Sequence, residues 1–237
     1  ADWMVCTDER DGPGSADGQN PTLFTAAAAS LRVLLVSEDV PYPSMGGLAK
    51  HALALGRALS HAGHRVDFMG NVEQEFRVAD PDLTMPGQFF AELEGTQRGW
   101  KERQLGFFNP WKRPAIARKI ARAILARAAD YDVVHYHGHF PNVAANIPTN
   151  INFVQTRHDQ GSDCLIHTRF RDGEICTTVD PTVCASCVAS HPNAVQRITS
   201  ASAVRVYRNQ VAAGFKRHKT IFVSDMLRRN FARCAGS

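Results

Sequence analysis

The stretch LRVLLVSEDVPYPSMGGLAKHALALGRALSHAGHRVDFMG, residues 31–70, decides the fold of this 237-residue chain. Residues 32–37 form a short, apolar and β-branched run, which is typical of a strand buried on both faces. Residues 38–47 interrupt the run with two prolines and two glycines. Residues 48–62 then repeat leucine and alanine at spacings of three and four, as one apolar helix face requires. Because residues 65–69 read as a second strand, the whole stretch forms a βαβ unit and predicts an α/β protein with a parallel sheet.

The loop of this unit carries Gly46 and Gly47, just before the expected start of the helix. In open parallel sheets, ligands bind beyond the carboxyl ends of the strands. Glycines there let a ligand approach the backbone, and the first helical N–H groups favour an anion such as a phosphate. A tight turn that needs glycine for its backbone angles explains the pair equally well. The patterns GxGxxG and GxxxxGK[ST] are absent, which counts against NAD dehydrogenases and P-loop enzymes.

The composition is that of a globular protein, with 44% hydrophobic and 21% charged residues. The net charge of +4 is too small to indicate a nucleic-acid partner by itself. No apolar run reaches the roughly 18 residues that a membrane span needs. The acidic start of the sequence also differs from a secretory signal. We therefore expect a cytoplasmic protein in a reducing compartment, where clustered cysteines are considered first as metal ligands.

Three segments lie outside the βαβ pattern. Residues 1–30 are rich in Asp, Gly, Ser and Ala and predict a flexible N-terminal extension. Residues 71–110 contain several prolines and scattered aromatic residues, which predict a loop insertion that packs on the domain or shapes a binding cleft. Residues 111–129 predict a helix with a strongly basic face. Its basic residues are Lys112, Arg113, Arg118, Lys119, Arg122 and Arg127. They suit either a solvated outer face or attraction to anionic lipid head groups or an acidic acceptor.

The remaining apolar runs predict strands at residues 132–136, 151–156 and 220–224, and helices at 200–218 and 225–234. With the first two strands, they predict a Rossmann-like parallel sheet covered by helices on both faces. The region from residue 31 to residue 237 is expected to form this single domain.

Histidines follow two of these strands at the edge where ligands are expected. His135, His137 and His139 alternate and therefore share one face if the strand continues. A metal site of three histidines from one strand is uncommon, so we expect one of them to line the cleft while the others pack or form hydrogen bonds. His158 lies just past the next strand, where it can donate a hydrogen bond to a sugar or phosphate. The alternative is a structural histidine held by Asp159 or by the backbone.

Four cysteines lie in a polar insertion at residues 160–192, with the spacing Cys164-x11-Cys176-x7-Cys184-x2-Cys187. Four thiolates can bind zinc tetrahedrally and staple a loop that has no core of its own. Only one pair has the tight CxxC spacing, so disulfide pairing and reduced, unliganded thiols stay open. The spacing matches neither common ferredoxin pattern.

Several motifs follow one another in a recognisable order. They are Pro41-x-Pro43 before Gly46-Gly47, then Gly63-His64-x-Val66, Asp132-Val133-Val134-His135-x-His137, Thr156-x-His158-Asp159, and Val223-Ser224 before a helix. Over about residues 31–233, this order resembles the N-terminal domain of the retaining GT-B glycosyltransferases of family four. The four-cysteine insertion is similar to one seen in a subset of these enzymes.

The resemblance implies one Rossmann-like half of a GT-B fold. Its N-terminal domain binds an acceptor, and a C-terminal domain binds the nucleotide-sugar donor. Gly46 and Gly47 would approach the diphosphate of the donor. His158 would be the catalytic residue that contacts the transferred sugar or the reacting centre, and we expect His137 and Asp159 to bind substrate beside it. The family needs no divalent metal for its chemistry, so zinc at the four cysteines would be structural.

The paired glutamates and basic phosphate-binding residues of the family's second domain have no counterpart in the 237 residues. We therefore expect an acceptor-binding half that does not turn over alone. With its partner domain it would be a hexosyltransferase-type, retaining enzyme of glycan biosynthesis. The acceptor would be a carbohydrate or a lipid-linked sugar, and the basic helix suits peripheral contact with the inner membrane face.

A rival hypothesis is a non-catalytic Rossmann-like module that uses the cysteine loop or the basic helix to hold a partner. A thiol-based redox protein is disfavoured, because Cys184-Ala185-Ser186-Cys187 lacks a thioredoxin-like βαβ context.

Overall fold

The computed structural model describes residues 4–5, 29–40, 46–71, 85–93, 112–165, 168–187 and 194–235. Seven strands of these residues form one sheet in the order β1-β9-β6-β5-β2-β3-β4, and every pairing is parallel. The strands are β1 (Met4–Val5), β2 (Arg32–Val36), β3 (Arg65–Gly70), β4 (Phe89–Ala91), β5 (Val133–His137), β6 (Phe153–Arg157) and β9 (Lys219–Phe222). A separate antiparallel hairpin pairs β7 (Phe170–Arg171) with β8 (Glu174–Ile175). The predicted α/β class with a parallel sheet is confirmed.

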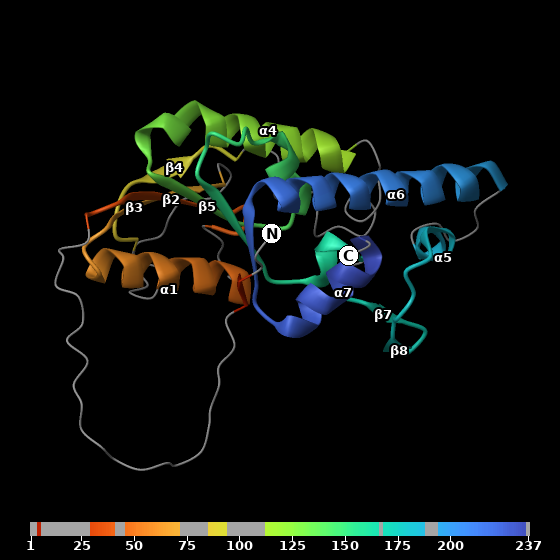
Figure 1. Cartoon of the computed structure of the whole chain (residues 1–237). Coiled ribbons are helices and arrows are strands. Elements are labelled where there is room, and N and C mark those ends of the chain that lie inside the picture. The colour runs from red at the N-terminus through yellow and green to blue at the C-terminus, as the bar shows by residue number, and fades with distance from the viewer. Residues whose placement is uncertain are drawn as a thin grey trace, which may run out of the picture.

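Helices cover both faces of the sheet, as predicted. Figure 1 shows α4 and α6 along one side and α1 and α7 along the other. The helices are α1 (Gly47–His61), α4 (Lys112–Arg127), α5 (Pro181–Ser186), α6 (Ala194–Arg217) and α7 (Asp225–Ala235). Short 3₁₀ turns η2 (Ala128–Asp130), η3 (Pro141–Asn146) and η4 (Gln160–Ser162) lie between them. Among the described residues, no helix combines the length and the apolar character that crossing a bilayer requires.

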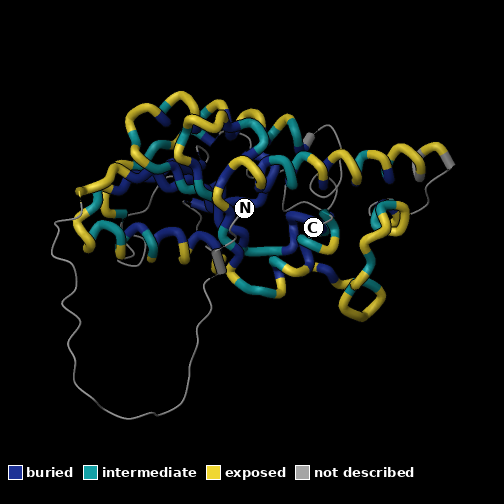
Figure 2. The backbone as a smooth tube through the Cα atoms, viewed as in Figure 1, coloured by how far each residue is buried: buried dark blue, intermediate teal, exposed yellow. Residues whose placement is uncertain are grey.

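Strand β2 lies inside the sheet, between β5 and β3, and both of its faces are apolar. Val33 and Leu35 pack in one core cluster with residues of α1. Leu34 and Val36 point the other way, into a second cluster that contains buried residues of α4. This alternation follows from the two-residue period of a strand. Figure 2 shows the resulting band of buried chain between the exposed outer turns of the helices.

Two glycines fix α1 on its face of the sheet. A Cβ atom at Gly56 would overlap the ring of Phe68 on β3, so the absence of a side chain lets the helix approach the strand closely. Gly63 has φ +90, a left-handed conformation that ends the helix and turns the chain toward β3. The structure therefore matches the expectation that the helix stops at Gly63.

Two strands of the main sheet were not predicted, and neither was the hairpin β7–β8. Met4 and Val5 lie in the segment predicted as a flexible extension, but they pair with Ile221 and Phe222 at one edge of the sheet. Strand β4 lies in the predicted loop insertion and pairs with β3 at the other edge. Both strands are too short to produce a visible alternation in the sequence. Residues 6–28, 72–84 and 94–111 lie outside the described residues.

Two phenylalanines of β4 tie the described part of residues 71–110 to the core, and the helix before β9 is longer than predicted. Phe89 packs against the core on the α1 side, and Phe90 packs against the core on the α4 side. Helix α6 begins at Ala194, six residues before the predicted start at residue 200. Its first turns expose Val195 and Ile198, so they lack the apolar stripe that would have revealed them.

Candidate functional site

The carboxyl ends of three adjacent strands, β2, β5 and β6, gather a group of polar side chains. Such an edge is the usual ligand side of an open parallel sheet. Most of these side chains are buried, which is uncommon for ionisable groups unless they are paired. The group consists of Glu38 and Asp39 after β2, His137 and His139 at the end of β5, and Arg157, His158 and Asp159 at the end of β6.

Helix α1 adds His51 to this group. The centroid of the His51 ring lies 5.5 Å from that of His137 and 4.9 Å from that of His158. The rings of His137 and His158 are 5.4 Å apart, so the three imidazoles form a nearly equilateral triangle. Because Gly47 is the first residue of α1 and His51 lies about one turn later, the N-terminus of the helix adjoins this triangle.

The glycine pair before α1 is not explained by its backbone angles. Gly46 has φ −75 and ψ 177, which any residue adopts, and Gly47 is helical. A Cβ atom built on either glycine would meet no described atom within 4 Å. A turn that needs glycine is therefore the wrong explanation for Gly46 and Gly47. The open space beside them leaves the first turn of α1 accessible to a ligand.

His137 and His158 contact each other at the centre of the site. His137 Nδ1 lies 3.1 Å from His158 Nε2, which is hydrogen-bonding distance. Burial, reinforced by the neighbouring His135 and His158, holds the pKa of His137 well below its usual value. Burial also lowers the pKa of His158 to about 4, helped by the nearby His51. Both rings are therefore neutral at neutral pH and can exchange hydrogen bonds with a substrate.

His139 forms a different, charged arrangement. Its Nε2 atom lies 3.0 Å from Asp39 Oδ2, and its Nδ1 atom lies 3.2 Å from Asp159 Oδ2. Burial by itself would lower the pKa of His139, but the hydrogen bonds to Asp159 and Asp39 outweigh it and raise the pKa to about 9. His139 is thus an imidazolium held between two carboxylates, which ties the ends of β2, β5 and β6 together.

Asp159 is already engaged by other groups of the protein. Its Oδ1 atom accepts from the backbone N–H of Gly161 at 2.8 Å and caps η4. The guanidinium of Arg157 lies 3.4 Å from the same oxygen, and His139 contacts the other. These contacts make Asp159 an organising residue of the loop. Substrate binding by Asp159, which the sequence predicts, stays a prediction.

Arg157 and Glu38, both buried, form hydrogen bonds that fix the turns around the site. Arg157 donates to the backbone carbonyl of Gly138 and to Ser162 Oγ at 3.2 Å. Glu38 accepts from the hydroxyl of Tyr136, and burial raises the pKa of this carboxyl although His139 and Tyr136 oppose the shift. A Cβ atom at Gly138 would overlap Glu38 and Tyr136, so only glycine fits at this turn.

His135 forms a hydrogen bond with Thr156 on the neighbouring strand β6. Its Nε2 atom lies 2.8 Å from Thr156 Oγ1, and burial lowers its pKa to about 4. Of the three alternating histidines, only His137 joins the triangle with His51 and His158. The three do not form a common metal site.

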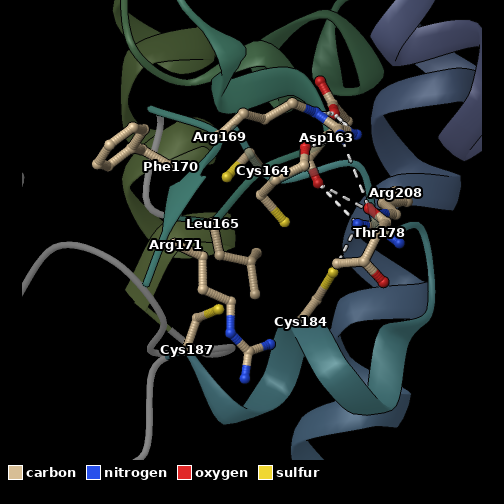
Figure 3. Close-up of a pocket in the computed structure, with 11 residues that line it drawn as sticks. Asp163, Cys164, Leu165, Arg169, Phe170, Arg171, Thr178, Cys184, Cys187 and Arg208 are labelled. Carbon is tan, nitrogen blue, oxygen red and sulfur yellow. Dashed lines mark hydrogen bonds and ion pairs between the residues drawn. The ribbon is translucent and has the colours of Figure 1, made fainter. Parts of the chain in front are cut away.

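The cysteine-rich insertion forms a second candidate site. Cys164, Cys176, Cys184 and Cys187 line one pocket, although 11, 7 and 2 residues separate them along the chain. In Figure 3, the labelled Cys164, Cys184 and Cys187 gather around Leu165. None of these four cysteines forms a disulfide.

The cysteine-rich insertion packs against the rest of the domain, whereas the sequence predicts a loop without a core of its own. Leu165 and Ala185 belong to the core cluster built on α6 and α7. Arg208 of α6 donates to the carbonyl of Asp163 at 3.1 and 3.0 Å, to the carbonyl of Val179 at 2.7 Å, and to Cys184 Sγ at 3.2 Å. The insertion is therefore fastened to α6 by apolar packing and by one arginine.

Cys234 is far from the four clustered cysteines in the sequence, but it lies near their pocket in the fold. Its Sγ atom accepts from Arg169 at 2.8 Å and lies 3.6 Å from Asp163 Oδ2. Arg169 and Asp163 both line the cysteine pocket, so α7 brings Cys234 to its edge.

The basic face of α4 is smaller than predicted. Arg113 is buried and donates to the hydroxyl of Tyr207 at 2.8 Å. Arg127 pairs with Glu92 and lies over the ring of Phe90, with its guanidinium carbon 3.7 Å from the ring centre. From residue 113 to residue 127 of α4, the exposed basic residues are Arg118, Lys119 and Arg122.

Sequence reasoning missed four residues of the site, namely His51, Glu38, Asp39 and Arg157. A signal existed for His51, because it lies four residues after Gly47 and so must sit about one turn into a helix that starts at the ligand edge. The other three are charged residues at strand ends, and only the sheet order reveals that they meet.

The comparisons with known proteins agree with this architecture. The model of the family described as Glycosyltransferase Family 4 matches residues 45–236, which include α1, the histidine triangle and the cysteine insertion. No curated protein matches the chain. The sheet order and the matched region together are those of one Rossmann-like half of the GT-B fold. The chain belongs to glycosyltransferase family 4.

Proposed function

We propose that this domain takes part in the transfer of a sugar from a nucleotide-sugar to an acceptor, with retention of the anomeric configuration. It would hold the acceptor, while a second Rossmann-like domain would hold the nucleotide. The observation that carries the proposal is the meeting of three features at one sheet edge: the open N-terminus of α1, His137 and His158.

The donor diphosphate would lie at the first turn of α1. Four unpaired N–H groups and the positive end of the helix dipole favour an anion there. The first turn contains no acidic residue that would repel it, and no side chain caps it. Gly46 and Gly47 leave the space that a phosphate would need.

His158 would contact the transferred sugar. Its ring is half-buried and neutral at neutral pH, so it can donate to or accept from a sugar hydroxyl without the cost of desolvating a charge. In the transfer, the acceptor oxygen bonds to the anomeric carbon while the bond to the donor phosphate oxygen breaks, and the acceptor proton passes to that phosphate. Such a reaction depends on positioning and on stabilising the leaving diphosphate more than on a protein nucleophile.

The acceptor would be a carbohydrate or a lipid-linked sugar. Exposed Arg118, Lys119 and Arg122 on α4 support peripheral contact with anionic lipid at the cytoplasmic face of the inner membrane. Because Arg113 and Arg127 have partners inside the protein, this attraction would be weaker than the six basic residues of the sequence suggest.

For the four clustered cysteines, the proposal is a structural zinc ion. A zinc ion with four thiolates carries a net charge of about −2, and Arg169, Arg171 and Arg208 line the same pocket and would offset it. Binding would draw the thiols inward and would tie the hairpin β7–β8 and α5 to the rest of the domain.

The experiment that tests the proposed transfer follows the anomeric centre of the product. An enzyme that carries this domain together with a donor-binding domain would be incubated with nucleotide-sugars and candidate acceptors, and the product would be followed by NMR from the first turnovers. The expected product keeps the configuration of the donor. An inverted product would overturn the retaining reaction. Absence of transfer with every donor, although the protein is folded, would favour the non-catalytic module.

A further inference from the structure

We propose that His51, His137 and His158 form a binding site for a divalent transition metal ion, with one imidazole nitrogen of each residue as a ligand. The proposal goes beyond the proposed function, since it concerns a ligand that sugar transfer in this family does not require. It is carried by the geometry of the three rings and by a buried nitrogen that has no hydrogen-bond partner among the described residues.

The three histidines are arranged as a chelating set. Their ligand atoms all lie within 4.8 Å of one another, and among the described residues no other group of three histidine, cysteine or acidic side chains has this property. In a tetrahedral site with bonds of roughly 2.0–2.1 Å, the nitrogens lie about 3.4 Å apart. The longest separation must therefore close by no more than about 1.4 Å. The side chain of His51 is on the exposed side of the triangle and can supply this movement by rotation.

His137 supplies the second, independent observation. Its side chain is fully buried, yet its Nε2 atom has no hydrogen-bond partner among the described residues. A buried polar atom without a partner costs free energy, and an ion beside it would remove this cost. The imidazole of His137, which adjoins His51 and His158, thus keeps one ring nitrogen without a partner among the described residues.

The neighbouring histidines do not compete for the role. His135 Nε2 is taken by Thr156 Oγ1, and both ring nitrogens of His139 face carboxylates. The three ligands come from α1, from the end of β5 and from the turn after β6, so an ion would link three elements of the fold. This wide separation along the chain explains why no metal-binding spacing is visible in the sequence.

The ligand set selects the class of ion. Imidazole nitrogen suits Zn²⁺, Cu²⁺, Ni²⁺ and Co²⁺, whereas Mg²⁺ and Ca²⁺ prefer oxygen ligands. Three histidines satisfy only part of a tetrahedral shell and leave one position for water or another small ligand, as in open zinc sites. Because His51 is the exposed member, this fourth position would lie on the solvent side.

The test uses Co²⁺ as the probe and the 237-residue chain, without donor or acceptor. Cobalt bound by imidazole nitrogens gives visible absorption bands without the sulfur-to-metal charge-transfer band that thiolate ligands produce, so the cysteine pocket is distinguished in the same spectrum. The variants are His51→Ala and His158→Ala. The matched control is His61→Ala, since His61 is an exposed histidine at the far end of the same helix. Melting curves verify that each variant is folded.

The expected result is one equivalent of Co²⁺ with an imidazole spectrum in the original chain and in His61→Ala. His51→Ala and His158→Ala should each weaken binding by more than about 10-fold. The proposal is overturned if the folded chain shows only the thiolate spectrum, or if His51→Ala and His158→Ala bind Co²⁺ as the control does. Since no sugar transfer is measured, neither result depends on the proposed function.

Discussion

His137 Nδ1 lies 3.1 Å from His158 Nε2, and this contact joins the carboxyl ends of β5 and β6. The two residues are 21 positions apart in the chain, but the strands that carry them are neighbours in the sheet. His51 closes the group from the first turns of α1. A cluster of three imidazole side chains therefore lies beside a helix N-terminus.

Replacing Gly47 by alanine should leave the fold intact but weaken donor use. A Cβ atom there meets no described atom, and alanine is a better helix former than glycine, so the melting temperature should stay the same or rise slightly. A methyl group beside the first turn should crowd the phosphate, and the KM for the nucleotide-sugar should rise about 10-fold or more. The measurement is steady-state kinetics in the two-domain enzyme, with melting curves on the same samples.

Gly56 provides the matched control on the same helix. A Cβ atom there overlaps Phe68, so Gly56→Ala should destabilise the protein by about 1–3 kcal/mol. The folded fraction of Gly56→Ala should keep the KM of the original enzyme for the nucleotide-sugar. If Gly47→Ala instead lowers stability as much as Gly56→Ala and leaves the KM unchanged, the glycine pair has a structural role.

The stability of the protein should fall as the pH rises from about 6.5 to about 9. The pKa of His139 is raised to about 9 by Asp159 and Asp39, while an unfolded histidine titrates near 6.5. The stabilisation is therefore complete below pH 6.5 and is lost as the pH rises through about 9, by roughly 2–3 kcal/mol. Denaturant unfolding across this range, with a chelator present, measures the effect. In His139→Gln the slope should vanish, and an unchanged slope would assign it to another group.

The parts of the structure that the sequence predicts are those with local patterns. Residues 32–36 show two apolar faces, and the helix after Gly46 repeats its apolar residues, so β2 and α1 were found almost to the residue. Strands β1 and β4 were missed because two or three residues at a sheet edge carry no period. The partner of Arg113 is Tyr207, 94 residues away, so no local pattern indicates that this basic residue is buried.

In the candidate site too, residues with a local sequence pattern were predicted and residues brought together only by the fold were not. His137 and His158 were identified because they follow predicted strands at the ligand edge. His51 was overlooked although its place one turn after Gly47 puts it near the ligand edge; its contact with His137 and His158 there depends on the strand order β6-β5-β2. Asp159 was assigned to substrate, but its contacts with Arg157, His139 and Gly161 form only in the folded chain.

The four clustered cysteines should bind zinc. The His51→Ala protein, in which the histidine triangle adds no zinc to the count, should contain about one equivalent by elemental analysis when it is purified under reducing conditions and without chelator. Cys184→Ser should lose it, and the loop near residues 168–187 should become more sensitive to protease. Cys234→Ser is the control, since Cys234 lies at the edge of the pocket and is not among the four proposed ligands. A protein without zinc that resists protease equally well would contradict the structural zinc.

Binding to anionic vesicles should depend on the exposed basic residues of α4. Replacing Arg118, Lys119 and Arg122 by glutamine removes three charges and should weaken binding by about 1 kcal/mol per charge at low salt. The control removes three exposed charges from the other side of the sheet, at Lys50 on α1 and at Arg229 and Arg233 on α7. Sedimentation with vesicles of neutral and anionic lipid measures both. If both triple variants lose vesicle binding equally, the attraction depends on the total charge of the protein and not on a specific surface on α4.

The central claim is that His158 acts on the transferred sugar and is not a structural histidine. The most direct measurement compares His158→Ala with His218→Ala in the two-domain enzyme, with a chelator present so that no ion at the histidine triangle contributes. His218 is buried and contacts the carbonyl of Ile147 at 2.9 Å, just before β9 and thus at the opposite edge of the sheet. Sugar transfer and melting temperature are measured on the same samples. The account predicts that His158→Ala lowers the transfer rate by about 100-fold or more with little change in melting temperature, while His218→Ala lowers the melting temperature and keeps the rate of the folded enzyme. Near-normal transfer by His158→Ala, or a loss that only follows its unfolding, would contradict the account.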